Sequence, residues 1–236
     1  MKKLICLLFA ASAFVSCVGD DTNPFAAAPE VPVIDKATVV EGLSTNVYEF
    51  TYDETLRIKT IKRDGNVDAD LLYTIIYDGS NRIKRVDATG NGGYVIEFLY
   101  DGAGKLNAYI RNEEDSETEI DYDAVTNAYS MPSYEFSFFF NSDLKRVNDH
   151  LYHYVDDKKG PMENVNADYH FLGLFLDDNL MYFASKKPID YYGTIDAPEE
   201  FSFNNTYNAD GYWETGSIPS VVSVSMEYVI RSVLIP

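Results

Sequence analysis

Cysteine is nearly absent from this chain, which has only Cys6 and Cys17. Cys6 falls in an apolar run close to the first residue, so a chain that has lost that run keeps Cys17 alone. One such chain has no internal disulfide and no thiolate zinc site. Basic residues are also scarce, since 19 Lys and Arg face 38 Asp and Glu for a formal charge of −19. A surface of that sign repels phosphate backbones, so we expect no nucleic-acid partner.

Recognisable catalytic and cofactor motifs are also missing. The chain has no glycine-rich phosphate loop that leads into a helix and no Gly-x-Ser-x-Gly segment. His150 and His153 are three residues apart in a strand-like segment, which places them on opposite faces and not around one metal ion. Adjacent acids such as Asp156 and Asp157 are typical of solvated turns and lack the separation that glycosidases need. We therefore predict a protein that is not an enzyme and that carries no cofactor and no metal.

The first seventeen residues are organised as a secretion signal. A short basic start precedes the apolar run Leu4 to Val15, which is twelve residues long and too short to span a membrane. Ser16 then precedes Cys17, with Phe14 where a lipobox usually has Leu. This pattern resembles a bacterial lipoprotein signal, in which the cysteine is acylated and becomes the new N-terminus. The resemblance implies a signal peptide over 1–16 and lipid attachment at Cys17. The alternative is an ordinary cleaved secretory peptide with a cysteine downstream.

The segment after Cys17 has the composition of a tether. Asp20-Asp21 resembles the surface-export signal of Bacteroidota lipoproteins, which implies display on the cell surface at the outer membrane, with the periplasmic face as the alternative. The stretch up to residue 34 contains several proline and alanine residues and predicts a flexible tether over 17–34. The remaining residues, 35–236, are enough for a single all-β repeat domain with its own core.

An internal repeat decides the expected architecture. Three strong copies are spaced 25 and 23 residues apart, and the dipeptide Tyr122-Asp123 follows 22 residues later. In each strong copy an aromatic ends an extended run, Asp starts a turn, and a basic residue followed by Ile or Leu restarts a strand. The strong copies are Tyr52–Lys59, Tyr77–Lys84 and Tyr100–Asn107. Weaker copies are expected at Phe140–Lys145 and Tyr207–Tyr212, the latter with Tyr212 in place of the base.

The repeat length corresponds to two strands and two turns. Tyr48, Phe50 and Tyr52 alternate with polar residues, as a strand with one buried face requires. No sustained helical periodicity occurs after the signal. The sequence therefore predicts an all-β fold: an antiparallel meander of Tyr-Asp hairpins that forms a large curled sheet or an open, barrel-like domain.

The three strong copies resemble the Tyr-Asp (YD) repeats of RHS-type proteins. More closely, the chain resembles small Bacteroidota surface lipoproteins of unknown function, in which such repeats build a porin-like curled antiparallel sheet. RHS shells run for many hundreds of residues around a toxin, and this chain is far too short for that. The resemblance consequently implies a fold and not an activity.

Aromatic residues supply the candidate binding site. Tyr212 and Trp213 follow a turn, and Tyr191 and Tyr192 lie in a second loop-like region. Adjacent aromatics in a strand point to opposite faces, so one of each pair is expected outside, where it can stack on a sugar or peptide. Alternatively, tyrosine is simply the strand residue of this repeat.

Three functions remain open at this point. The first is an outer-membrane, lipid-anchored and non-catalytic protein that captures an extracellular glycan or protein ligand. The second is a structural or assembly lipoprotein that pairs with a partner through its sheet edges. A hydrolase whose cleft escapes motif recognition is a distant third.

Overall fold

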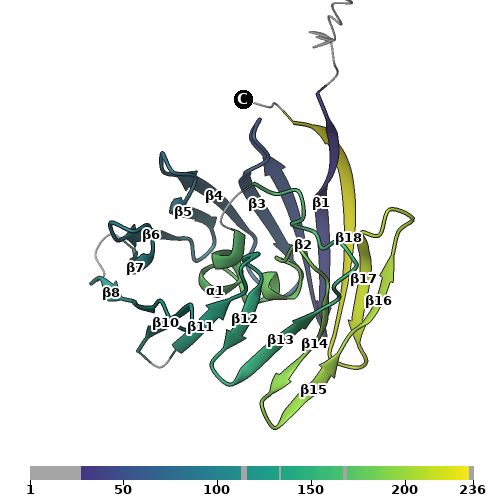
Figure 1. The fold of residues 1–236 in the computed structure, drawn as a ribbon. Helices are drawn as coiled ribbons and strands as arrows, with labels where there is room; N and C mark the ends of the chain where they lie inside the picture. Colours follow the sequence, from purple (N-terminus) through teal and green to yellow (C-terminus); the bar gives the residue numbers. More distant parts are fainter. Residues whose placement is uncertain (1–27, 113–115, 133, 167–168, 234–236) are drawn as a thin grey trace, which may run out of the picture.

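The computed structural model describes residues 28–112, 116–132, 134–166 and 169–233, and these form two antiparallel sheets that face each other (Figure 1). The larger sheet has eleven strands, in the order β16 (Asn204–Tyr207), β17 (Trp213–Ile218), β18 (Val222–Ser232), β1 (Glu30–Glu41), β2 (Ser44–Tyr52), β3 (Ile58–Gly65), β4 (Leu71–Tyr77), β5 (Ile83–Gly90), β6 (Tyr94–Tyr100), β7 (Leu106–Arg111) and β8 (Thr118–Glu119). The smaller sheet has seven strands, in the order β15 (Ala197–Ser202), β14 (Ile189–Thr194), β13 (His150–Tyr154), β12 (Leu144–Val147), β11 (Tyr134–Phe138), β10 (Ala128–Met131) and β9 (Asp121–Asp123). The predicted all-β antiparallel class is confirmed.

The chain closes on itself through its first and last strands. β1 pairs with β18 from Glu30 opposite Ser232 to Glu41 opposite Val222. Residues 30–34, which the sequence assigned to the tether, therefore belong to the sheet. Val33 and Ile34 are fully buried there, and that burial outweighs the breaking tendency of Pro32. A single residue joins the sheets at each corner: Ile120 between β8 and β9, and Phe203 between β15 and β16.

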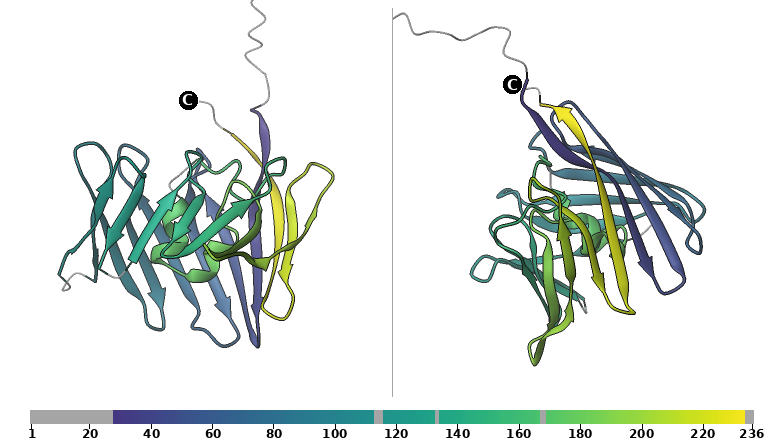
Figure 2. Two further views of the ribbon diagram at one scale, coloured as in Figure 1. Left: turned by 60° about the horizontal axis from the view of Figure 1, so that its bottom comes forward. Right: turned by 90° about the vertical axis from the view of Figure 1, so that its right-hand side faces the viewer.

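The antiparallel order places every Tyr-Asp-type turn at one end of the strands. That end also carries the start of β1 and the end of β18, as both views of Figure 2 show. We call it the terminal end; its turns span residues 53–57, 78–82, 101–105, 124–127, 139–143 and 208–212. The opposite end, which we call the distal end, holds the connections at 42–43, 66–70, 91–93, 148–149, 195–196 and 219–221.

The three strong Tyr-Asp turns are built by the same hydrogen bonds. In the first copy the Asp53 Oδ1 accepts the amide N–H groups of Thr55 at 2.9 Å and Arg57 at 3.0 Å, and Leu56 has a φ of 61°. The tyrosine of the following unit then closes the repeat. The Tyr77 hydroxyl donates to the Ile58 carbonyl at 2.9 Å, while the Arg57 guanidinium lies 4.8 Å from the Tyr77 ring centroid. The next copy makes the same two contacts: the Tyr100 hydroxyl donates to the Ile83 carbonyl, and the Arg82 guanidinium lies over the Tyr100 ring.

The expected copy at Phe140–Lys145 begins two residues too late. The amide of Phe139 donates to the Asp143 carbonyl, as Asp53 does to Arg57, and Ser142 takes the positive φ of Leu56. The copy therefore starts at Phe138, and Phe139 occupies the aspartate position. The Tyr154 hydroxyl donates to the Leu144 carbonyl at 2.8 Å and completes the unit. Because Phe138, Phe139 and Phe140 are consecutive, the sequence does not show which of the three occupies the aromatic position of the repeat.

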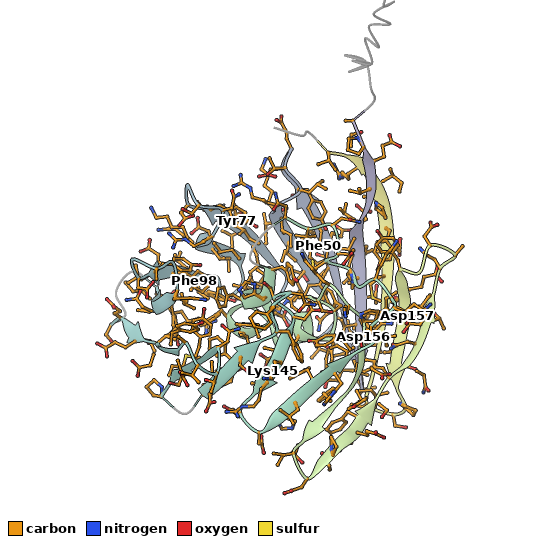
Figure 3. The ribbon with its side chains drawn as sticks, viewed as in Figure 1. Phe50, Tyr77, Phe98, Lys145, Asp156 and Asp157 are labelled. Carbon is orange, nitrogen blue, oxygen red and sulfur yellow. The ribbon has the colours of Figure 1, made fainter. Side chains whose placement is uncertain are left out.

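The space between the sheets is filled by an insertion, residues 155–188. Val155 N–H donates to the Pro188 carbonyl at 2.9 Å, the same bond that closes the Tyr-Asp turns, so this segment replaces a turn between β13 and β14. It contains the short helices η1 (Tyr169–Phe171), α1 (Leu172–Phe175) and η2 (Asp178–Tyr182), which the sequence did not predict. Its buried apolar side chains meet Phe50 and Phe98 from the larger sheet (Figure 3).

Candidate functional site

Tyr212 and Trp213 do not form an exposed platform, and that expectation is wrong. Trp213 is fully buried and Tyr212 is 6% exposed. Trp213 stands where the strand restarts after the turn, the place that Ile58 holds in the first copy, and its ring packs against Phe203 with centroids 6.0 Å apart. Tyr212 packs on Tyr228 at 5.4 Å. Both side chains serve the core of the repeat and have no free face for stacking on a ligand.

Tyr191 and Tyr192 lie on opposite faces of β14. Tyr191 stacks on His153 with ring centroids 4.3 Å apart, while Tyr192 faces the interior side and stacks on Tyr152 at 5.4 Å. Both tyrosines are half-buried. The two adjacent tyrosines thus point to opposite faces of the strand, as expected, and Tyr192 is the one that lines a cleft at the distal end.

Tyr192 belongs to an aromatic cleft at the distal end, with a volume of about 470 Å³. Four tyrosines from four different elements contribute to its wall: Tyr134 of β11, Tyr152 of β13, Tyr182 of η2 and Tyr192 of β14. Tyr182 and Tyr192 have centroids 6.5 Å apart. The polar members of the wall are Glu41, Asn148, His150, Asp178 and Asn179. Rings and hydrogen-bonding groups therefore line the same hollow.

A second, more polar cleft of about 540 Å³ adjoins the first. Glu41, Asp178 and Asn179 line both, so the two clefts are neighbours with a shared wall, and we call them together the distal groove. Arg63 and Arg111 supply cations to the second cleft, and Asp68 supplies a further carboxylate.

Asp177 fixes the helical wall of the groove to the larger sheet. Its carboxylate accepts hydrogen bonds from the Arg63 guanidinium at 2.7 Å and from the Tyr48 hydroxyl at 3.0 Å. Its other oxygen accepts the Asn179 N–H at 3.0 Å and caps η2. The side chain is only 5% exposed. Asp177 is thus occupied by structural contacts, which leaves Asp178 as the carboxylate of this adjacent pair that is available to the groove.

Three side chains of the groove have raised pKa values. Burial raises the pKa of Asp178, and the adjacent charge of Asp177 raises it further. Burial also raises the pKa of Tyr182 and of Tyr192 above the ordinary tyrosine value. These hydroxyls consequently remain protonated at neutral pH and can both donate and accept hydrogen bonds.

Other sequence candidates lie outside the groove or on different faces. His150 is near Tyr192 on the interior side, whereas His153 stacks on Tyr191 outside, so the two histidines do face opposite ways. Asp156 and Asp157 lie at the surface (Figure 3), with side chains 94% and 79% exposed. Within the described ranges, no three or more His, Cys, Asp or Glu side chains gather as a metal site would require. Cys17 and the predicted signal peptide lie outside the described residues.

No helix among the residues that the structure describes is long and apolar enough to cross a membrane. No protein-family model matches the chain, and no curated protein matches it. Among solved structures, it is similar to a porin-like protein from Bacteroides uniformis ATCC 8492, with 9% identity and a TM-score of 0.43. That similarity covers 84% of this chain and 98% of the other. What the chain does must be argued from its own residues.

Proposed function

We propose that this protein is a lipid-anchored outer-membrane lipoprotein that captures an extracellular carbohydrate in the distal groove and performs no chemistry on it. The four tyrosines of the groove carry the proposal. Tyrosine presents a flat apolar face to the C–H side of a sugar ring and a hydroxyl to its edge. Asn148, Asn179 and Asp178 add the donors and acceptors that orient sugar hydroxyls.

The charge of the groove favours an uncharged oligosaccharide. Carboxylates outnumber cations along the groove, because Glu41 and Asp178 line both halves and Asp68 lines the second. Arg63 of that half is already paired with Asp177, which leaves Arg111 as its other cation. The whole chain carries a formal charge of −19. A sulfated or sialylated glycan would meet repulsion from these carboxylates. The join between the two clefts favours an extended chain over a monosaccharide. The proposed ligand class is therefore a neutral oligosaccharide or polysaccharide.

The sheet edges favour capture over the alternative of assembly through strand pairing. The edge strand β15 carries Pro198, Glu199 and Glu200, and the edge strand β9 carries Asp121 and Asp123. Proline and charged side chains on an edge weaken pairing with another strand. The edge strands β8, β9 and β16 are also only two, three and four residues long.

A glycan array probed with the full chain tests the proposal, with Tyr192→Ala beside Tyr191→Ala. The two residues are adjacent on β14 but face opposite sides, which makes Tyr191→Ala a matched control. We expect binding of a neutral glycan that Tyr192→Ala weakens by about tenfold or more and Tyr191→Ala leaves unchanged. An array without any binding, or equal losses in both variants, would overturn the carbohydrate site.

The anchor rests on Cys17 and is tested separately. A Cys17→Ala chain should incorporate no palmitate and leave the membrane fraction, while wild-type chain should remain there. On intact cells, added protease should digest the wild-type domain if it is displayed outside. Palmitate incorporation by Cys17→Ala would refute the attachment site, and protection from the protease would place the domain on the periplasmic side.

A further inference from the structure

The turn between β11 and β12 departs from its repeat in a way that folding does not explain. The other turns place Asp or Asn at the capping position, with Glu54, Gly79, Gly102 or Ala209 next. Here the two positions are Phe139 and Phe140. The change loses the carboxylate that accepts backbone N–H groups in the other copies. Phe140 gains no burial, because it is fully exposed, while Phe139 is 40% exposed and packs edge-on against Tyr154 with ring centroids 6.1 Å apart. A local rule broken without a gain in stability points to function.

A third apolar side chain joins these two phenylalanines. Val125, in the neighbouring turn between β9 and β10, is 95% exposed. The two turns are tied together by a hydrogen bond of 3.0 Å from the Asn127 side-chain amide to the Phe138 carbonyl. Val125, Phe139 and Phe140 also border one shared hollow. They form a single protruding patch, which we call the aromatic tip.

The aromatic tip lies at the terminal end, the end of the strands at which β1 begins and from which the chain leads back to Cys17. Pro29 is twelve residue steps from Cys17, and these steps span at most about 43 Å when fully extended. The twelve residues of β1 alone are about 40 Å long. To turn the distal end toward the membrane, the tether would have to run at nearly full stretch along the whole domain. A chain anchored at Cys17 accordingly presents its terminal end to the lipid.

Charge at the terminal end suits contact with a neutral lipid surface. Arg82 and Lys105 line the hollow beside the aromatic tip, and Lys187 lines the hollow on its other side. Two carboxylates there are paired with cations, Asp78 with Arg82 and Asp156 with Lys187, each at 2.6 Å. Asp101 and Asp123 instead accept backbone N–H groups within their own turns. Aromatic side chains flanked by long cationic side chains are typical of the lipid–water interface.

We propose that the aromatic tip inserts into the lipid leaflet that holds the acylated Cys17 and thereby orients the domain with its distal groove facing away from the membrane. This inference rests on the lipid anchor of the proposed function. It adds a second attachment to the single lipid-modified cysteine, and two attachments hold a domain far more firmly and in a defined orientation.

The test uses tryptophan as a depth reporter in the full, lipidated chain. Phe140→Trp places a reporter in the aromatic tip, and Leu43→Trp places one in an exposed turn of the distal end, where Leu43 is 92% exposed. Both positions are at the surface, so neither change disturbs the core. The native Trp213 is fully buried and supplies the background. Each protein is reconstituted into phosphatidylcholine vesicles that contain brominated phosphatidylcholine.

We expect bromolipid to quench Phe140→Trp and to leave Leu43→Trp and wild type unaffected. Quenching of Leu43→Trp, or of neither variant in acylated protein, would overturn the proposed orientation. Palmitate content of the same samples separates this result from the anchor. If the chain carries no palmitate, the proposed lipid attachment at Cys17 is refuted. The partitioning of Cys17→Ala protein into the vesicles then tests membrane insertion by the aromatic tip without any contribution from a lipid anchor. Phe140→Ser should then lower partitioning by about tenfold or more, and an unchanged partition coefficient would overturn the tip.

Discussion

At the scale of the residue, one carboxylate organises each strong copy of the repeat. Asp53 accepts the N–H groups of Thr55 and Arg57 and pairs with the Arg57 guanidinium at 2.6 Å. Asn208 has the same place in the last copy and accepts the N–H groups of Asp210 and Tyr212, both at 3.0 Å, with no charge at all. The turn therefore requires the side-chain oxygen as a hydrogen-bond acceptor, and the negative charge of aspartate adds further stability.

This division predicts different effects of two substitutions at Asp53. Asp53→Ala should lower the unfolding free energy by about 1 kcal/mol, because two backbone N–H groups lose their acceptor. Asp53→Asn should cost less, since its side-chain oxygen can accept as Asn208 does. Urea denaturation at pH 7 measures both. Equal losses for the two variants would show that the ion pair, and not the acceptor, holds the turn.

The same residue predicts a dependence on pH. Burial raises the pKa of Asp53, but hydrogen bonds from Arg57 and Thr55 outweigh that effect and lower it below its usual value. Protons then bind the unfolded chain more readily, so the stability that this charge adds is present above about pH 4 and is lost as the pH falls through the lowered pKa. The difference in unfolding free energy between wild type and Asp53→Asn should consequently shrink between pH 7 and pH 3.

At the scale of the element, the insertion between β13 and β14 does two things at once. Its apolar side chains fill the space between the sheets; Phe175, for example, packs edge-on against Phe98 with centroids 5.2 Å apart. Its last helix, η2, carries Asp178, Asn179 and Tyr182 to the distal groove. One segment thus fills the core and forms one wall of the distal groove. Asp177 joins this segment to the larger sheet through Arg63 and Tyr48.

Loss of the Asp177 carboxylate should damage both stability and binding. Asp177→Ala leaves Arg63, whose side chain is 14% exposed, without its partner, and should lower the unfolding free energy by about 3–5 kcal/mol. Asp178→Asn is the matched control next to it, because burial already disfavours the charge of Asp178. Thermal denaturation of the two variants measures the difference. A small loss in Asp177→Ala would mean that η2 is held by its apolar contacts alone.

At the scale of the whole molecule, the antiparallel hairpins can be predicted from the sequence, whereas the contacts between distant segments cannot. The period-two pattern and the turn residues indicated antiparallel hairpins, because each hairpin is set by neighbours in sequence. Trp213 was misplaced because burial depends on Phe203, which approaches it from a neighbouring segment in space. The groove tyrosines come from β11, β13, β14 and η2, and their spacing in the sequence does not predict that their side chains line one cleft. The insertion escaped notice because its helices are too short to establish a period.

Closure of the chain on itself leads to a prediction about cooperativity. A linear array of repeats loses stability step by step as units are removed, because each unit contacts only its neighbours. Here β18 lies between β17 and β1, and eleven residue pairs join it to the first strand. Removal of residues 219–236 therefore exposes the edge of β1 and opens the core that Val33, Ile34, Val224 and Met226 share. We expect this truncated chain to lose its cooperative thermal transition and to be digested rapidly by protease.

Deletion of residues 234–236 alone retains all of β18 and provides the control for shortening the chain. It should unfold as the wild type does in calorimetry, with one transition at the same temperature. A cooperative transition in the longer truncation, with an enthalpy reduced only in proportion to the residues removed, would mean that the hairpins fold as an array and that the pairing of β1 with β18 is dispensable. Loss of the whole transition would instead mean that β1 folds stably only when β18 pairs with it, and that the repeats fold as one cooperative unit.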